Sequence, residues 1–201
     1  RNTGIRKSNA RLIAFLDSDD SWLPEKLAAQ IAFFENHAHA VACQTEEIWM
    51  RNARRVNPRK RHRKPSGNIF EPSLRLCLVS PSAVMLKRSL LEEVGLFDEE
   101  FPACEDYDLW LRISCRHAVY LINHHLVVKE GGHQDQLSRR ITGLDRYRIR
   151  ALVKLLKSRE LSEVQIRAVM KELAFKCGIY GRGCLKRGKK DQGKGKNAVL
   201  G

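Results

Sequence analysis

Two groups of closely spaced carboxylates are the residues of this chain best suited to chemistry. The first group, Asp17, Asp19 and Asp20, directly follows the apolar run Leu12–Leu16. Three acids this close repel one another unless a cation lies among them or one of them takes up a proton. Hard divalent cations such as Mg²⁺ bind one or two carboxylates and complete their coordination with substrate phosphates. The group is therefore a candidate metal site.

A simpler interpretation of the same residues is helix capping. Pro24 suits the first turn of a helix, and Asp20 or Ser21 could cap that helix, where the helix dipole favours acids. Capping explains one or two of the carboxylates but not Asp17, which is still attached to the end of the apolar run. Open α/β sheets also place ligands at the carboxyl ends of strands. The residues alone leave metal binding and capping open.

The second group of acids lies in the segment GLFDEEFPACEDYDLWLRI. An acid-rich turn before a helix is commonly solvated, and here Glu105 or Asp106 could cap the helix that carries Leu109 and Trp110. A catalytic interpretation requires a carboxylate near an acceptor hydroxyl, with a pKa that allows it to accept a proton. A carboxylate at a helix N-terminus beside aromatic residues is a suitable candidate. The acids of the segment are Asp98, Glu99, Glu100, Glu105, Asp106 and Asp108.

Alternating strands and helices must hold these two groups, and the alternation predicts an α/β domain. Continuous apolar runs predict buried strands, and apolar residues at helical spacing predict helices. We expect Leu27, Ile31 and Phe34 to form the buried face of the first long helix. The predicted strands are 12–16, 40–50, 83–87 and 118–128, and the predicted helices are 24–37, 89–95 and 105–117.

The C-terminal part has a different character. From Gly143 to about Tyr180 the spacing of apolar residues predicts amphipathic helices, which we expect to pack against one another. Glycine and lysine then dominate the sequence. We therefore expect a helical extension at 143–187 and a flexible basic tail at 188–201.

The charge of the chain limits its partners. The 201 residues carry a net charge of +14, which favours nucleic acid, an anionic membrane face or phosphorylated substrates. The basic segment NPRKRHRKPSG has no interleaved aromatic residues to stack on bases, so a solvated loop is favoured over a nucleic-acid patch. An intermediate interpretation is a loop that steers an anionic donor or a phosphorylated lipid head group toward the site.

Two further features favour a cytoplasmic protein. The six cysteines form no C-x-x-C pair, which indicates reduced thiols rather than a zinc site or a disulfide scaffold. No apolar run reaches the ~18 residues of a membrane span, and no signal peptide is visible.

The two acidic segments resemble parts of family 2 glycosyltransferases, which have the GT-A fold. Members carry R-N-x-G, a spacer, an apolar strand, a D-x-D or D-D motif and a proline-led helix, and later E-D-x-D-L-W-L-R. Here these are residues 1–4, the acids at 17–20 and the pattern at 105–112. Asn9 stands where the family commonly has glycine. The resemblance covers about residues 1–140.

The resemblance implies a donor site around the first motif. Asp19, with Asp17 or Asp20, would bind Mg²⁺ or Mn²⁺ that bridges the diphosphate of a nucleotide sugar, and one of these acids would approach the ribose. Asn2 and Gly4 would also belong to the donor side.

A later loop completes the implied donor site. His133 follows Gly131 and Gly132 and would lie near the metal and the diphosphate, while Gln136 and Ser138 are weaker candidates.

The second motif implies the chemistry. Asp106 would be the catalytic base of an inverting transfer, with Glu105 in reserve. It would remove the proton from an acceptor hydroxyl, which attacks the anomeric carbon directly. Trp110 is expected in the core or the pocket wall, and Arg112 as a structural partner of acids.

The resemblance thus implies an α/β fold with a GT-A-like (Rossmann-like) mixed sheet flanked by helices, incomplete at the N-terminus and followed by the helical extension. Residues 1–142 would be the C-terminal portion of the transferase domain. The implied substrates are a UDP- or GDP-sugar donor and a saccharide or lipid-linked acceptor, as in cell-envelope polysaccharide biosynthesis. The implied location is cytoplasmic, with peripheral contact to the anionic inner face of a membrane and no nucleic-acid partner.

Two alternatives stay open. In the family, strands that hold the nucleotide base precede R-N-x-G, and nothing like them is in this sequence. The chain could therefore be a truncated or inactive transferase that acts only as a binding module. A basic nucleic-acid-binding protein is supported by charge alone and leaves the two acidic groups unexplained.

Overall fold

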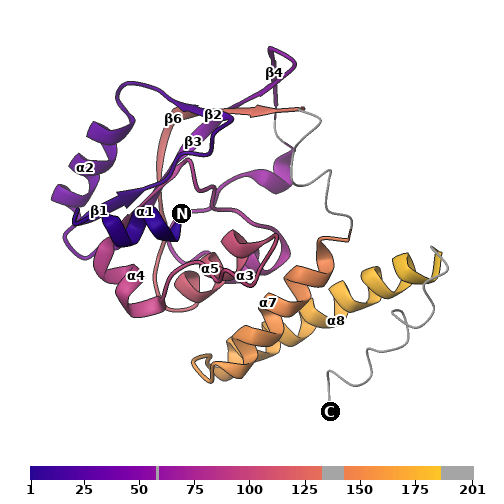
Figure 1. The fold of residues 1–201 in the computed structure, drawn as a ribbon. Helices are drawn as coiled ribbons and strands as arrows, with labels where there is room; N and C mark the ends of the chain where they lie inside the picture. Colours follow the sequence, from indigo (N-terminus) through magenta and orange to yellow (C-terminus); the bar gives the residue numbers. More distant parts are fainter. Residues whose placement is uncertain (58, 133–142, 187–201) are drawn as a thin grey trace.

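The computed structural model describes residues 1–57, 59–132 and 143–186 and contains one mixed sheet with helices packed around it (Figure 1). Its strands are β1 (Leu12–Ala14), β2 (Asp20–Trp22), β3 (Ala42–Arg51), β4 (Arg54–Val56), β5 (Val84–Lys87) and β6 (Tyr120–Gly131). Its helices are α1 (Asn2–Lys7), α2 (Lys26–Asn36), α3 (Phe70–Arg75), α4 (Arg88–Val94), α5 (Glu105–Ser114), α7 (Asp145–Lys157) and α8 (Glu163–Lys186), with a 3₁₀ turn, η1, at Lys60–His62.

The sheet is built around β3. Its strand order is β1-β5-β3-β6-β2, and β4 pairs with the outer half of β3. The β3–β6 pair is parallel and the other pairs are antiparallel. The mixed sheet and its flanking helices confirm the predicted α/β class, with apolar strands of the kind expected for a sheet that is covered on both faces.

Opposite faces of the sheet pack against different helices. Leu86 on β5 lies in a buried cluster that includes Leu90 of α4 and Trp110 of α5, so these helices cover one face. Its neighbour Met85 points the other way and packs with Phe34 of α2. This alternation is the period of two expected for a β-strand.

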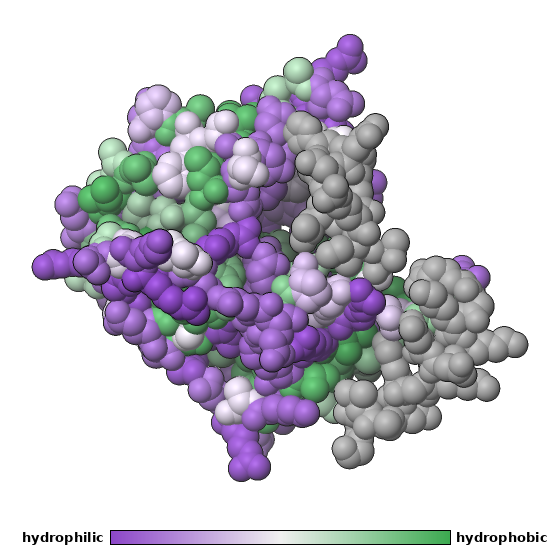
Figure 2. Space-filling model, viewed as in Figure 1, coloured by the Kyte–Doolittle hydropathy of each residue, from purple (hydrophilic) through white to green (hydrophobic). Residues whose placement is uncertain are grey.

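The predicted buried face of α2 was wrong at Leu27 and Ile31 and right at Phe34. Leu27 and Ile31 are each 42% exposed, whereas Lys26 and Gln30 are fully buried together with Phe34. The reason is polar: the Gln30 amide donates to the carbonyl oxygen of Ala83 at 3.0 Å and accepts from Lys26 Nζ at 2.6 Å. Buried carbonyl groups require partners, and apolar side chains could not supply them. Figure 2 shows the resulting apolar surface over α2.

Most of the other predicted elements are present with small shifts. The first strand ends at Ala14 instead of residue 16, and Leu16 is exposed. Helix α4 ends at Gly95, whose φ of +84° suits glycine at a helix end. The predicted strand at 40–50 continues into the β3–β4 hairpin, whose turn residues Asn52 and Ala53 both have positive φ.

The two C-terminal helices pack against each other, as predicted, and share a core with α5. Leu152 of α7 and Leu173 of α8 are buried in one cluster with Tyr107 and Leu111 of α5. Lys154 of α7 also forms an ion pair with the buried Asp108 of α5 at 3.0 Å. Residues 145–186 are therefore packed onto the sheet domain, and the predicted tail at 188–201 lies outside the described residues.

Leu152→Ala should lower the free energy of unfolding by ~2–5 kcal/mol, because Leu152 is fully buried where α7 joins the cluster that includes α5. Val164→Ala, at a side chain on α8 that is 67% exposed, should change it by less than ~0.5 kcal/mol. Urea denaturation followed by circular dichroism measures both. A similar small effect for the two variants would show that the helices do not depend on this contact.

Candidate active site

A row of side chains crosses three strands at the centre of the site. Lys129 on β6 lies opposite Asp20 of β2 on one side and opposite Trp49 of β3 on the other. Residues in register on neighbouring strands share one face of the sheet. The row therefore joins the first acidic group to an aromatic side chain that is distant in sequence.

Ser82 fixes the acidic turn between β1 and β2. Its hydroxyl accepts from the Asp17 backbone NH at 3.1 Å and donates to Asp20 Oδ2 at 2.6 Å. Its carbonyl oxygen accepts from Trp22 Nε1 at 2.8 Å. Burial raises the pKa of Asp20, and the Ser82 hydrogen bond and the charge of Lys129 oppose that rise. Asp20 is thus a buried anchor of this turn.

Asp19 and Asp17 are the more accessible acids of this group. Asp19 is exposed in the turn, and the Asp17 side chain is partly exposed. Among the described residues, no group of three or more His, Cys, Asp or Glu side chains is arranged as a metal cage. A Mg²⁺ or Mn²⁺ that takes one or two carboxylates and otherwise binds substrate phosphates fits this donor set. The predicted metal ligands Asp19, Asp17 and Asp20 stay a proposal.

Arg1 brings the two acidic groups together. Its guanidinium donates to Asp17 Oδ1 and to Glu105 Oε1, both at 2.5 Å. These carboxylates are 88 positions apart in the sequence. Arg1 also lies over the ring of Phe97. One cation thus spans the distance between the strand end and the start of α5.

Asp106 lies in the first turn of α5 and lines a cavity of about 160 Å³ together with Lys129. Its Oδ1 accepts from the Tyr107 backbone NH at 2.7 Å, and Cys77 Sγ lies 3.5 Å from its Oδ2. Burial raises the pKa of Asp106, and the nearby negative charge of Glu105 raises it further. A raised pKa makes this carboxylate a better proton acceptor at neutral pH.

A buried ion pair forms the floor beside Asp106. Lys64 Nζ lies 3.2 Å from Glu47 Oε1, and both side chains are almost completely buried. Burial opposes ionisation of Glu47, but the charges of Lys64 and Lys129 hold its pKa below the ordinary value. Lys129 donates to Ser80 Oγ at 3.1 Å, and although burial disfavours its charge, Glu47 and Asp20 raise its pKa. This network keeps cations next to the candidate base.

Of the other residues predicted for the donor side, Asn2 and Gly4 lie on α1. Asn2 is buried, and its amide donates to the Phe97 carbonyl oxygen at 2.8 Å and accepts from the Phe97 NH at 3.1 Å. These bonds anchor α1, so we infer that Asn2 positions Arg1. Gly4 lies on the same helix with open space beside its Cα. His133, Gln136 and Ser138 lie outside the described residues.

The expectations for α5 beyond its acids are confirmed. Trp110 is buried in the core, and Arg112 pairs with Asp108 at 2.9 Å.

Four residues that contribute to the site were not among the predicted site residues: Arg1, Ser82, Lys129 and Trp49. A lysine within the apolar run LVVKE was a usable signal, because strands buried in a sheet rarely carry an unpaired charge. Ser82 carried no such signal, since a turn before a strand explains a serine equally well.

Comparison with known proteins gives a match to one protein family. Residues 1–95 match the family model described as glycosyl transferase family 2. The match extends from the first motif through α4 and agrees with the resemblance.

Similar proteins agree with this assignment. An uncharacterized glycosyltransferase of Rickettsia bellii is 32% identical over 122 residues, which are 58% of this chain and 16% of the relative. WfgD of Escherichia coli, named UDP-Glc:alpha-D-GlcNAc-diphosphoundecaprenol beta-1,3-glucosyltransferase, is 32% identical over 126 residues, 61% of this chain and 46% of the relative.

The crystal structure of S. aureus TarS 1–349 in complex with UDP-GlcNAc has the same fold, with a TM-score of 0.66 and 16% identity. The match covers 86% of this chain and 50% of that chain, and it confirms the predicted GT-A fold. This chain spans half or less of the length of all three proteins.

No helix within the described residues is long and apolar enough to cross a membrane.

Asp106→Asn should raise the free energy of unfolding at pH 7. Because the folded-state pKa of Asp106 is raised, ionising it at neutral pH costs stability that Asn does not lose. Below the unfolded pKa of about 3.9 both states are protonated and this effect vanishes. As the pH rises from the unfolded-state pKa to the folded-state pKa, the stability gained by Asp106→Asn grows. It reaches ~1.4 kcal/mol for each unit by which these two pKa values differ and is constant at higher pH.

Urea denaturation between pH 3.5 and 8 measures this effect. Asp98→Asn is the control with the opposite sign: despite partial burial, Lys154 lowers the pKa of Asp98, so this variant should lose stability at pH 7. A loss of stability in Asp106→Asn across the whole pH range would contradict the assigned direction.

Glu47→Gln should cost ~3–5 kcal/mol, because it leaves the buried charge of Lys64 without its partner. Glu92→Gln, at an exposed acid on α4, should be nearly neutral. The double variant Glu47→Leu/Lys64→Met should recover most of the loss, since it removes both charges. Thermal denaturation of the unaltered chain and the three variants checks this. If the double variant loses as much stability as Glu47→Gln, the stability of this region requires the two charges themselves.

Proposed function

We propose that this chain carries the catalytic portion of a glycosyltransferase that moves a sugar from a nucleotide-sugar donor to an acceptor hydroxyl with inversion. The observation that most supports this proposal is that the Arg1 guanidinium forms ion pairs with both Asp17 and Glu105. It brings the expected donor-side acids next to the expected base. A single-displacement transfer needs these two groups on opposite sides of one reacting carbon.

Asp106 is the proposed base. It takes the proton from the acceptor hydroxyl as that oxygen attacks the anomeric carbon, while the bond to the nucleoside diphosphate breaks. Its cavity and its raised pKa support the role. Glu105 lies next to it but is bound to Arg1, so we assign Glu105 to positioning.

The acidic turn is the proposed place of the donor diphosphate. Asp19 and Asp17 would hold a Mg²⁺ or Mn²⁺ there, while Asp20 and Ser82 keep the turn in shape. When bound, the divalent cation neutralises the charge of the diphosphate. Lys129 and Arg1 supply further positive charge that belongs to the protein itself.

The proposed acceptor is a saccharide carried on a lipid diphosphate. WfgD is named for a GlcNAc-diphosphoundecaprenol acceptor, and TarS was solved with UDP-GlcNAc. The net charge of +14 suits anionic substrates and peripheral contact with an anionic membrane surface. A UDP-sugar is the donor we test first.

UDP should bind this chain with a Mn²⁺ dependence that Asp19→Asn abolishes, because the variant removes a proposed metal ligand. Isothermal titration of UDP and of GDP, with and without Mn²⁺, measures this. Glu35→Gln removes an exposed acid on α2 and should leave binding unchanged. Absence of UDP and GDP binding in the unaltered chain would refute donor binding by this portion.

Asp106→Asn should reduce kcat by ~10²–10⁴-fold, because general-base catalysis contributes about that much, and should leave Mn²⁺-dependent UDP binding intact. Radiolabelled transfer to a diphosphate-linked GlcNAc acceptor measures kcat. Donor binding without any transfer by the unaltered chain would instead support the binding-module alternative.

A further inference from the structure

We propose that a basic cavity beside the candidate site binds the phosphate groups of the acceptor, with Trp49 as the surface on which its first sugar rests. This inference rests on the proposed transferase function and deepens it. It assigns a recognition subsite to the segment between β3 and the buried Lys64.

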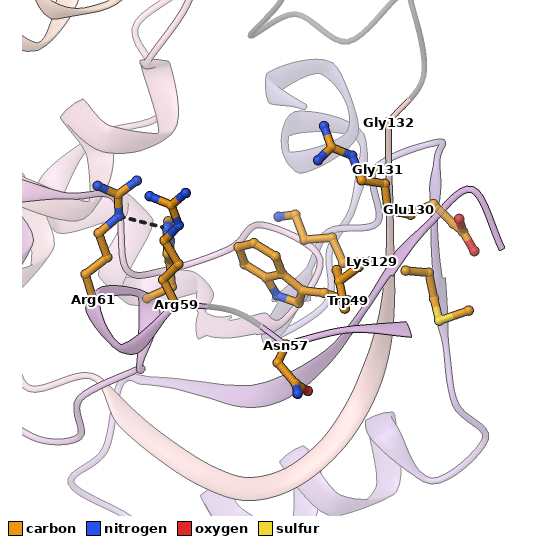
Figure 3. Close-up of a pocket in the computed structure, with 12 residues that line it drawn as sticks. Trp49, Asn57, Arg59, Arg61, Lys129, Glu130, Gly131 and Gly132 are labelled. Atoms are coloured by element: carbon orange, nitrogen blue, oxygen red, sulfur yellow. Dashed lines mark hydrogen bonds between the residues drawn. The ribbon is translucent and has the colours of Figure 1, made fainter. Parts of the chain in front are cut away.

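The cavity has the size and lining of a ligand site. It measures about 420 Å³, within the usual range of small-molecule sites, and lies between the β3–β4 hairpin, η1 and the end of β6. Trp49 and Lys129 lie in its middle, and Arg59 and Arg61 stand at one side (Figure 3). Aromatic side chains with a few polar groups are the usual lining for a sugar-bearing ligand.

The charge of the lining selects an anion. Among the described residues that line the cavity, four are permanent cations, Arg51, Arg59, Arg61 and Lys129, and Glu130 is the one acid. In Figure 3 the Glu130 carboxylate points away from Trp49 and Arg59. Arginine forks match phosphate oxygens in geometry and charge.

His62 helps to position Arg61. Its Nε2 lies 3.3 Å from Arg61 Nε, and its ring packs edge-on against Trp49 with centroids 5.3 Å apart. Burial lowers the pKa of His62, and the charges of Arg61 and Arg59 lower it further. A neutral imidazole can accept the Arg61 hydrogen bond, which leaves the other guanidinium NH groups for a ligand.

The basic cavity adjoins the smaller cavity that contains the proposed base. Trp49, His62 and Lys129 line both this cavity and the smaller one that contains Asp106. A ligand with phosphates near Arg59 and Arg61 and a sugar on Trp49 would therefore extend toward Asp106. A donor diphosphate is not the expected occupant, because the proposed donor site is the acidic turn on the other side of Lys129.

The test compares two ligands that differ by the diphosphate group alone: octyl-diphospho-N-acetylglucosamine and the neutral octyl N-acetylglucosaminide. Isothermal titration of the unaltered chain should show at least tenfold tighter binding of the diphosphate, with an affinity that falls as salt is raised. Arg59→Ala and Arg61→Ala should each weaken it about tenfold and leave the neutral ligand unchanged.

Two arginines of the same segment provide matched controls. Arg55→Ala and Arg63→Ala remove the same charge from exposed side chains outside the cavity lining, so they should change binding less than twofold. Equal losses in all four variants would reduce the effect to general charge attraction and overturn the subsite. Trp49→Phe should weaken both ligands, since the sugar is common to them.

UDP separates this inference from the proposed function. If Arg59→Ala weakens UDP as much as the diphospho-sugar, or UDP competes with it, the cavity is a donor site and the inference is wrong. If UDP binds with Mn²⁺ but the two octyl ligands bind equally, the subsite fails and the transferase proposal stands. If the diphospho-sugar binds through Arg59 and Arg61 but UDP does not bind, donor binding fails while the anion subsite stands.

Discussion

The site depends on a shift of register in β6. Thr45 of β3 lies opposite Ile122, but Glu47 lies opposite Val127, so β6 contains extra residues between these two pairs. Without the shift, Lys129 would lie opposite residue 52, in the hairpin turn. With it, Lys129 lies between Asp20 and Trp49, where it is the common neighbour of the acidic turn and the basic cavity. Irregularities of this kind often redirect side chains next to functional sites.

The charges around Lys129 hold each other in place. Glu47 and Lys64 are buried, Lys129 lies partly buried beside them, and isolated charges at such positions would be very costly. Asp20 and Ser82 add a carboxylate and a hydroxyl on the other side. Because each ion lies near an ion of opposite charge, these side chains remain charged. Lys129 is then a positive charge between Asp20 and Glu47. A row of apolar side chains would pack equally well but could not attract phosphates.

Much of the fold could be predicted from the sequence, because the apolar runs and helix ends are local signals. The strand at 83–87, the α4 end at Gly95 and the buried Trp110 all follow from periodicity and glycine. The buried face of α2 could not, since Gln30 finds its partner at the distant Ala83 carbonyl oxygen, and Lys26 finds its partners at Gln30 and over the Trp22 ring. The register shift in β6 was equally hidden: the polar residues NHH within it indicated only a break between two apolar runs.

The candidate site was also predictable from the sequence only where its signals are local. Both acidic groups were visible as short patterns, whereas the residues that join them come from separate elements. Arg1 pairs with Asp17 and Glu105, and the charge of Lys129 is stabilised by Glu47 and Asp20, only because the fold brings these segments together. Motifs thus located the acids, and tertiary structure supplied the cations.

The C-terminal helices take part in this arrangement through α5. Asp108 lies two positions after Asp106, is buried, and is held by both Arg112 and Lys154. Lys154 belongs to α7 and also binds Asp98, which lies before α5, at 2.7 Å. Lys154 thus binds one acid before Asp106 in the sequence and one acid after it. Since α7 is fixed in turn by α8 in a shared apolar cluster, residues 145–186 set the orientation of α5 and therefore the position of the proposed base.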